Sequence, residues 1–178
     1  MKNRTKLLRM TLAALFLSLA YVLPFLTGQI HEFGSMLCPM HIPVLLAGFI
    51  CGTPWGLMVG FLAPLSRSFM LGMPPFFPKA ICMAFELAIY GAAAGFFYKT
   101  FPHKRGYTYI SLILAMISGR IVWGAAMYVC MGISGEGFTF AAFLTGAVIQ
   151  AIPGIILQLI LVPAIVFAVD RKEFYGGK

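Results

Sequence analysis

The stretch PKAICMAFELAIYGAAAGFFY, residues 78–98, decides what kind of protein this chain forms. Its 21 residues include one acidic side chain, Glu86, and one basic side chain, Lys79, which stands near the start. A helix needs about 20 mainly apolar residues to cross the hydrocarbon core of a bilayer. The stretch therefore predicts a membrane-spanning helix that carries one buried carboxylate.

The composition extends this prediction to the whole chain. Of 178 residues, 61% are hydrophobic and 10% are charged, whereas a soluble domain has roughly 25% charged residues. A soluble core of this size cannot hide so much apolar surface. We expect an all-α membrane protein, a single integral domain over residues 1–178, with six spanning helices. Their predicted ranges are 5–25, 41–51, 53–69, 78–98, 107–131 and 138–169. The second is short for a full span, and the last contains two prolines where kinks are expected.

The basic residues predict how these helices are oriented. With six spans, one side of the membrane holds ten of the thirteen lysines and arginines, namely Lys2, Arg4, Lys6, Arg9, Lys99, Lys104, Arg105, Arg171, Lys172 and Lys178. The positive-inside rule places that side, and with it both termini, in the cytoplasm. The net charge of +8 is thus explained by topology, and nucleic-acid binding is not expected. The apolar N-terminal segment is interpreted as a retained helix rather than a cleaved signal peptide.

Small residues predict where helices pack closely. Gly52, Gly56 and Gly60 recur every four residues in the third predicted helix, and Gly91 and Gly95 repeat the spacing in the fourth. Such faces let helix backbones approach each other in lipid.

Few polar side chains lie inside the predicted spans, and each is a candidate for the binding site because burying it in lipid is costly. Glu86, Arg120 and Gln150 fall at similar depths on three helices, about 12–17 Å below their outer ends. They predict a cavity reached from outside, with Arg67 on a loop above it. Two alternatives stay open. In the first, Glu86 and Arg120 form an ion pair that only fixes helix packing. In the second, either Arg120 or Arg67 receives an anionic or carbonyl group of a ligand. Gln158 lies deeper and is interpreted as a packing hydrogen bond.

His41, at the outer start of the second predicted helix, has three interpretations. It is a hydrogen-bonded interface residue, a ligand contact, or an axial ligand to a substrate that carries a metal macrocycle. Histidine and cysteine spacings typical of protein metal sites are missing, so no metal or cofactor is expected. Phe69, Met70, Met73, Phe76 and Phe77 form an apolar cluster in an outer loop, which we expect either to cover the bundle as a lid or to insert into the membrane interface.

Motifs for ATP binding and hydrolysis are missing from the sequence, so the chain is not expected to be an enzyme. If the chain takes part in active import, the energy would come from partner subunits or from an ion gradient.

The chain resembles the substrate-binding S components of energy-coupling factor (ECF) vitamin importers. The resemblance rests on the basic N-terminus before TLAALFLSLA, and on the blocks PMHIPVLLAGFICG (39–52), PLSRS (64–68), GMPP (72–75) and FELAIYG (85–91). It implies capture of a vitamin near the outer face and its release by toppling in the membrane. The implied partners are a transmembrane coupling subunit, contacted by Ala14 and Ser18, and two cytoplasmic ATPases. The implied location is a prokaryotic plasma membrane, in which the chain spans the bilayer several times. Tyr90, within FELAIYG, joins the ligand candidates.

The substrate stays open at this point. The PMHIPV and FELAIYG blocks resemble most a branch assigned to pantothenate, whose carboxylate would suit an arginine. Cobalamin or haem would suit His41 instead. A different class of function, a stand-alone proton-coupled carrier or channel that uses Glu86 and Arg120, is the remaining alternative.

Overall fold

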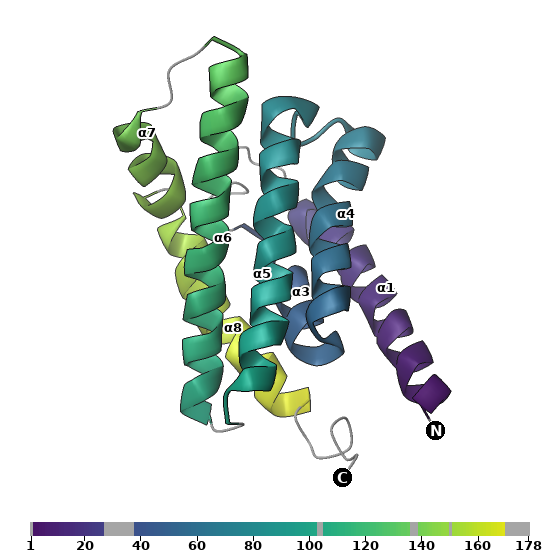
Figure 1. Ribbon diagram of the computed structural model, residues 1–178. Helices are drawn as coiled ribbons and strands as arrows, with labels where there is room; N and C mark the ends of the chain where they lie inside the picture. The colour runs from purple at the N-terminus through teal and green to yellow at the C-terminus, as the bar shows by residue number, and fades with distance from the viewer. Residues whose placement is uncertain (1, 27–37, 103–104, 136–138, 150, 170–178) are drawn as a thin grey trace.

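The computed structural model describes residues 2–26, 38–102, 105–135, 139–149 and 151–169, and this part of the chain is all helical (Figure 1). It contains the helices α1 (Lys2–Leu26), α3 (His41–Leu46), α4 (Thr53–Leu71), α5 (Ile81–Thr100), α6 (Arg105–Ile133), α7 (Phe140–Leu144) and α8 (Ile152–Val169). Three π-helical turns, η1 (Ala47–Cys51), η2 (Phe76–Ala80) and η3 (Thr145–Ile149), continue or precede these helices. The predicted all-α class is confirmed for the described residues.

Four helical stretches are long and apolar enough to cross a membrane: Thr5–Phe25, Phe76–Thr100, Gly106–Ile133 and Ile152–Val169. The chain is therefore a multi-pass membrane protein. The apolar helix His41–Cys51 is shorter, and α4 carries Arg67 between two serines near its end. The count of six spans stays a prediction.

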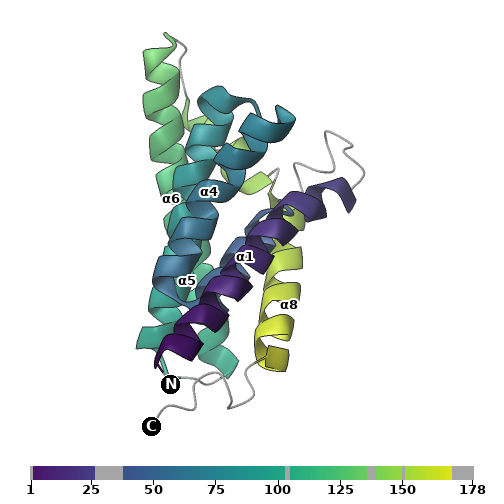
Figure 2. The same ribbon diagram turned by 90° about the vertical axis from the view of Figure 1, so that its right-hand side faces the viewer.

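The bundle is built around α5. Figure 1 shows α4, α5 and α6 side by side, with α8 crossing behind α6, and α5 packs against both α4 and α6. Figure 2 shows α1 slanting across the other side of the bundle. The short α3 is enclosed by α1, α4, α5 and α8, and each of its residues is buried. The start of α1 and the end of α8 lie at the same end of the bundle (Figures 1 and 2).

Glycines set the distance between α4 and α5, as predicted. A Cβ atom on Gly56 would collide with the backbone of Gly91, and one on Gly60 would collide with the backbone of Leu87. The two helices thus touch backbone to backbone, which makes van der Waals packing efficient in lipid, where the hydrophobic effect does not drive helices together.

The last predicted helix is divided in the structure. The segment α7–η3 ends at Ile149, Ala151 forms a turn, and α8 begins at Ile152. Pro153 is the second residue of α8, where its missing N–H needs no partner. The predicted kink at Pro153 is thus a helix start, whereas Pro163 lies inside α8.

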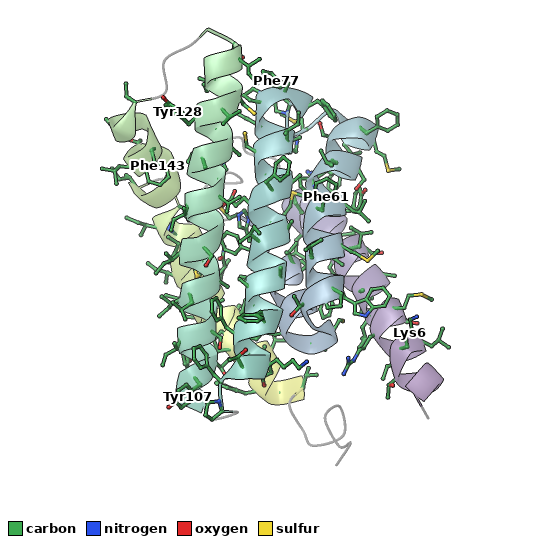
Figure 3. All side chains as sticks on the ribbon, viewed as in Figure 1. Lys6, Phe61, Phe77, Tyr107, Tyr128 and Phe143 are labelled. Atoms are coloured by element: carbon green, nitrogen blue, oxygen red, sulfur yellow. The ribbon has the colours of Figure 1, made fainter. Side chains whose placement is uncertain are left out.

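The apolar cluster Phe69, Met70, Met73, Phe76 and Phe77 is exposed, Phe69 most of all at 88%. Gly72, in the left-handed conformation with φ of 68°, ends α4 within this cluster. Phe77 lies at the end of the bundle opposite Tyr107 (Figure 3). The cluster does not cover the bundle as a lid in this structure, and its exposure agrees with the alternative of insertion into the membrane interface.

Candidate functional site: a buried histidine, glutamate and arginine between two cavities

Glu86 joins two other polar side chains inside the bundle. Its Oε1 lies 2.9 Å from a terminal guanidinium nitrogen of Arg120 and 3.4 Å from Nε2 of His41. Glu86 and His41 are 2% and 3% exposed, and Arg120 is 15% exposed. Three elements, α3, α5 and α6, therefore bring three predicted site residues to one point.

Tyr90 and Gly119 shape the wall beside these residues. Tyr90 lies one helical turn below Glu86 on α5 and packs edge-on against His41, with ring centroids 5.1 Å apart. A Cβ on Gly119 would collide with the Tyr90 ring. Because Gly119 directly precedes Arg120 on α6, the missing side chain leaves room for the tyrosine next to the guanidinium.

Several polar atoms at this place have no hydrogen-bond partner among the described residues. They are Nδ1 of His41, the hydroxyl of Tyr90 and Nε of Arg120. On α8, both amide atoms of Gln158 share this property, so no described residue forms the predicted packing hydrogen bond, and Gln158 lines neither cavity. Buried polar atoms are nearly always paired in proteins. The unpaired atoms of His41, Tyr90 and Arg120 lie on the cavity walls and can bind a polar ligand without first breaking a hydrogen bond to a described residue.

The first of two cavities holds the charged and polar groups of the site within a mixed wall. It has a volume of about 220 Å³ and reaches Glu86, Arg120 and His41. Other side chains on its wall include Cys38, Met40, Met83 and Trp123. Burial raises the pKa of the Cys38 thiol, which keeps it uncharged 3.9 Å from the Arg120 guanidinium.

The second cavity is apolar and larger, about 440 Å³. This volume lies within the range of about 300–1,000 Å³ that is usual for small-molecule sites. Its polar wall residues are Tyr90 and Arg120, and its apolar wall comes from α6, α7 and α8 through Ile113, Ile117, Ile121, Phe143, Ile155 and Leu159. Arg120 thus lines both cavities.

Arg67 lies elsewhere, contrary to its predicted place on a loop above the site. It belongs to α4, and its guanidinium donates hydrogen bonds to the backbone carbonyl oxygens of Tyr21, at 2.8 Å, and Met73, at 3.3 Å. It also lies over the ring of Phe25, 5.2 Å from its centroid. Neither cavity includes Arg67 on its wall. In the structure Arg67 links α1, α4 and the following loop.

Three further residues were predicted to have a role: Gln150, Ala14 and Ser18. Gln150 lies outside the described residues. Ala14 and Ser18 are exposed on α1, away from the site. Within the described ranges, no group of three or more histidine, cysteine, aspartate or glutamate residues could hold a metal ion.

The apolar residues of the larger cavity were not predicted from the sequence. Phe143, Ile155 and Leu159 resemble ordinary core or lipid-facing residues, and no pattern separates them from the rest of an apolar helix. Trp123 and Phe143 stack with ring centroids 6.2 Å apart, one ring on each cavity. Cys38 directly precedes the PMHIPV block. Its closeness to His41 in the sequence is the one signal that could have identified it as a site residue.

This arrangement suits binding rather than bond chemistry. A guanidinium binds a carboxylate through two parallel hydrogen bonds, and Arg120 still has an unpaired Nε for such a contact. Buried charges persist when they are paired, and Glu86 supplies the pairing charge.

Comparison with known proteins gives one match. The model of the family described as "ECF transporter, substrate-specific component" matches residues 8–166. Searches of curated proteins and of solved structures found no significant match. Because the family model covers most of the chain, this protein belongs to the substrate-specific components of ECF transporters.

Proposed function

We propose that this substrate-specific component captures a small molecule with a carboxylate at Arg120, between the two cavities. The observation that carries the proposal is the position of Arg120. It lines both cavities, it is largely buried, and its Nε has no partner among the described residues. Its two terminal nitrogens face the Glu86 carboxylate and the Cys38 thiol, whereas Arg67 donates to backbone carbonyl oxygens and lines neither cavity.

The charges around Glu86 support an exchange of partners when the ligand binds. Oε1 of Glu86 is close to both Arg120 and His41. A ligand carboxylate at the guanidinium would compete with Glu86, whose Oε1 would keep its contact with Nε2 of His41. The ion pair between Glu86 and Arg120 would thus also serve as the binding site, so the two sequence-based alternatives are compatible.

Pantothenate is the first vitamin to test, because the resemblance of the PMHIPV and FELAIYG blocks indicates it and because it has one carboxylate. A metal macrocycle is less favoured by the geometry. His41 would have to act as axial ligand, but it is 3% exposed and its Nε2 is engaged with Glu86.

For the transport cycle we propose six spans, cytoplasmic termini in a prokaryotic plasma membrane, and toppling to release the vitamin. Ala14 and Ser18 on α1 would contact the coupling subunit, which two ATPases drive. The hydroxyl of Ser18 donates a hydrogen bond to the carbonyl oxygen of Ala14 at 3.0 Å. Because this bond holds the hydroxyl against the helix, Ser18 can act as a small packing residue much as alanine would.

Purification with endogenous ligand, followed by mass spectrometry, tests the proposed capture. The wild-type protein is expected to retain one small carboxylate-containing molecule, and Arg120→Ala is expected to lose it. Lys99→Ala, which removes an exposed charge from the end of α5, serves as the matched control and should retain the ligand. Equal retention by Arg120→Ala and the wild type would contradict the proposal.

Uptake into liposomes tests the dependence on partners. The retained molecule should enter vesicles only when the coupling subunit, both ATPases and ATP are present. Uptake by this chain alone, driven by a pH gradient, would instead identify a proton-coupled carrier.

A further inference from the structure

Two cavities of different polarity meet at one charged side chain. The smaller cavity contains the polar groups of His41 and Glu86, whereas seven of the nine side chains around the larger one are apolar. Arg120 is common to both, and the stacked rings of Trp123 and Phe143 lie one on each. A ligand whose charge is held by Arg120 therefore has an apolar space next to it.

The apolar cavity lies toward the lipid-facing side of the bundle. Ile113, Ile117 and Ile121 are spaced four residues apart on α6, so they form one face of that helix. Each is about half exposed, and each lines the cavity. Ile155 and Leu159 repeat the spacing on α8, which crosses α6 (Figure 1). The wall is thus made by two apolar helix faces.

The polar groups on this wall are few. They are the Tyr90 hydroxyl, which has no partner among the described residues, and the Arg120 guanidinium. A ligand hydroxyl or amide placed deeper in the cavity would meet no further polar group among the described wall residues, and each unpaired polar group lowers affinity by about tenfold or more. A ligand that is hydrophilic over its whole length does not suit this space.

We infer that the substrate of this component is an amphipathic monocarboxylate, with its carboxylate at Arg120 and an apolar body in the cavity between α6 and α8. The Tyr90 hydroxyl, adjacent to the guanidinium, can donate a hydrogen bond to the same carboxylate. This inference rests on the proposed function and narrows its substrate class. It places pantothenate, with its hydroxyls and amide, below acids with an aliphatic or ring-like apolar body.

A homologous series of acids measures the depth of the apolar site. The full-length protein is placed in phosphatidylcholine nanodiscs, and binding of butanoate, hexanoate, octanoate and pantothenate is compared, with empty nanodiscs subtracted. Each methylene that enters the cavity should increase affinity by about fourfold, so octanoate should bind on the order of a hundredfold more tightly than butanoate. 1-Octanol, which lacks the carboxylate, should bind much more weakly than octanoate.

A matched pair of substitutions assigns the effect to the cavity. Ile117→Trp places bulk on the cavity wall, whereas Ile110→Trp places it on the same helix at a position of similar exposure that does not line the cavity. Ile117→Trp should reduce octanoate affinity by tenfold or more and leave butanoate affinity nearly unchanged. Ile110→Trp should change neither. Because butanoate binding reports on an intact Arg120 site, a misfolded variant would lose both acids.

The outcomes separate this inference from the proposed function. If pantothenate binds in a manner that depends on Arg120, and affinity for the acids does not rise with chain length, the inference is wrong and the proposed function stands. If no small molecule binds in a manner that depends on Arg120, both fail. If the cavity retains phospholipid that octanoate does not displace, and Arg120→Ala retains it equally, the cavity is a lipid site and the inference is overturned.

Discussion

Arg120 and Arg67 are both largely buried, and their hydrogen bonds differ in kind. Arg67 donates to backbone carbonyl oxygens on two segments, which fixes the position of those segments. Arg120 faces a carboxylate, a thiol and two cavities, and its Nε has no described partner. A guanidinium in the second setting can exchange one anion for another, so we propose both a structural and a binding role for the pair with Glu86.

A double-mutant cycle on Glu86 and Arg120 separates these two roles. Arg120→Gln alone should lower the free energy of unfolding by about 3–5 kcal/mol, because it leaves the buried Glu86 carboxylate without its partner. The double variant Glu86→Gln/Arg120→Gln should return to within about 1–2 kcal/mol of the wild type, since buried ion pairs are often replaceable by neutral groups. Unfolding is measured by detergent titration, and ligand binding is measured in parallel. Recovery of ligand binding in the double variant, together with stability, would show that the pair serves packing alone.

The polar part of the site was predictable from sequence, because polar residues in apolar helices are rare and therefore conspicuous. Glu86, Arg120 and His41 were identified in this way, and the structure brings them together. Arg67 stands near the end of the predicted helix 53–69 and at the start of the proline-rich stretch 66–80, which suggested a loop position for its side chain. In the structure α4 continues to Leu71 and ends at Gly72. The apolar cavity was not predictable, since it depends on how α6 and α8 cross rather than on residue type.

At the scale of elements, the close packing of α4 on α5 is the helix contact that the sequence predicts most clearly. The four-residue glycine spacing predicted a close approach, and Gly56 meets the backbone of Gly91 in the structure. This contact supports the site because α5 carries both Glu86 and Tyr90. The break between η3 and α8 was less predictable, since a proline inside an apolar stretch is compatible with either a kink or a new helix start.

A glycine substitution tests this packing. Gly91→Ala places a methyl group against the backbone of Gly56, and the resulting overpacking should cost about 1–3 kcal/mol of stability. Gly132→Ala is the matched control, because no atom lies within 4 Å of its added Cβ; the protein should keep its stability or gain up to about 1 kcal/mol. Thermal unfolding in detergent compares the two variants. Equal melting temperatures would contradict close packing of α4 on α5.

At the scale of the whole molecule, the apolar exterior and the distribution of charge between the two ends of the bundle predict how the chain is oriented in the membrane. Large apolar side chains are exposed along α1, α6 and α8, as expected for a surface that faces lipid. The end of α5 and the start of α6 lie at the same end of the bundle as the start of α1 (Figure 1). Positive charges concentrated at that end predict that it faces the cytoplasm.

Cysteine labelling checks this orientation. Ser134→Cys, at the exposed turn after α6, should react with a membrane-impermeant maleimide in intact cells, and Lys99→Cys should react only after the cells are opened. The unsubstituted protein controls for its own four cysteines, of which Cys51, Cys82 and Cys130 are buried. Labelling of Lys99→Cys in intact cells would reverse the proposed topology.

The contact with the coupling subunit can be tested on α1. Ala14→Trp and Ser18→Trp should each reduce co-purification of the coupling subunit and ATPases by roughly tenfold or more, because a large ring prevents close helix approach. Ile160→Trp, an exposed position on α8, provides the control and should leave the complex intact. All three variants should bind ligand normally. Full assembly with tryptophan at both α1 positions would exclude this face as the contact.

The most direct test of the central claim is an experimental structure of the protein with its retained ligand. We expect a ligand carboxylate within hydrogen-bond distance of the Arg120 guanidinium and an apolar body between α6 and α8. A ligand bound elsewhere, with Arg120 still paired to Glu86 and no ligand atom in either cavity, would contradict this claim.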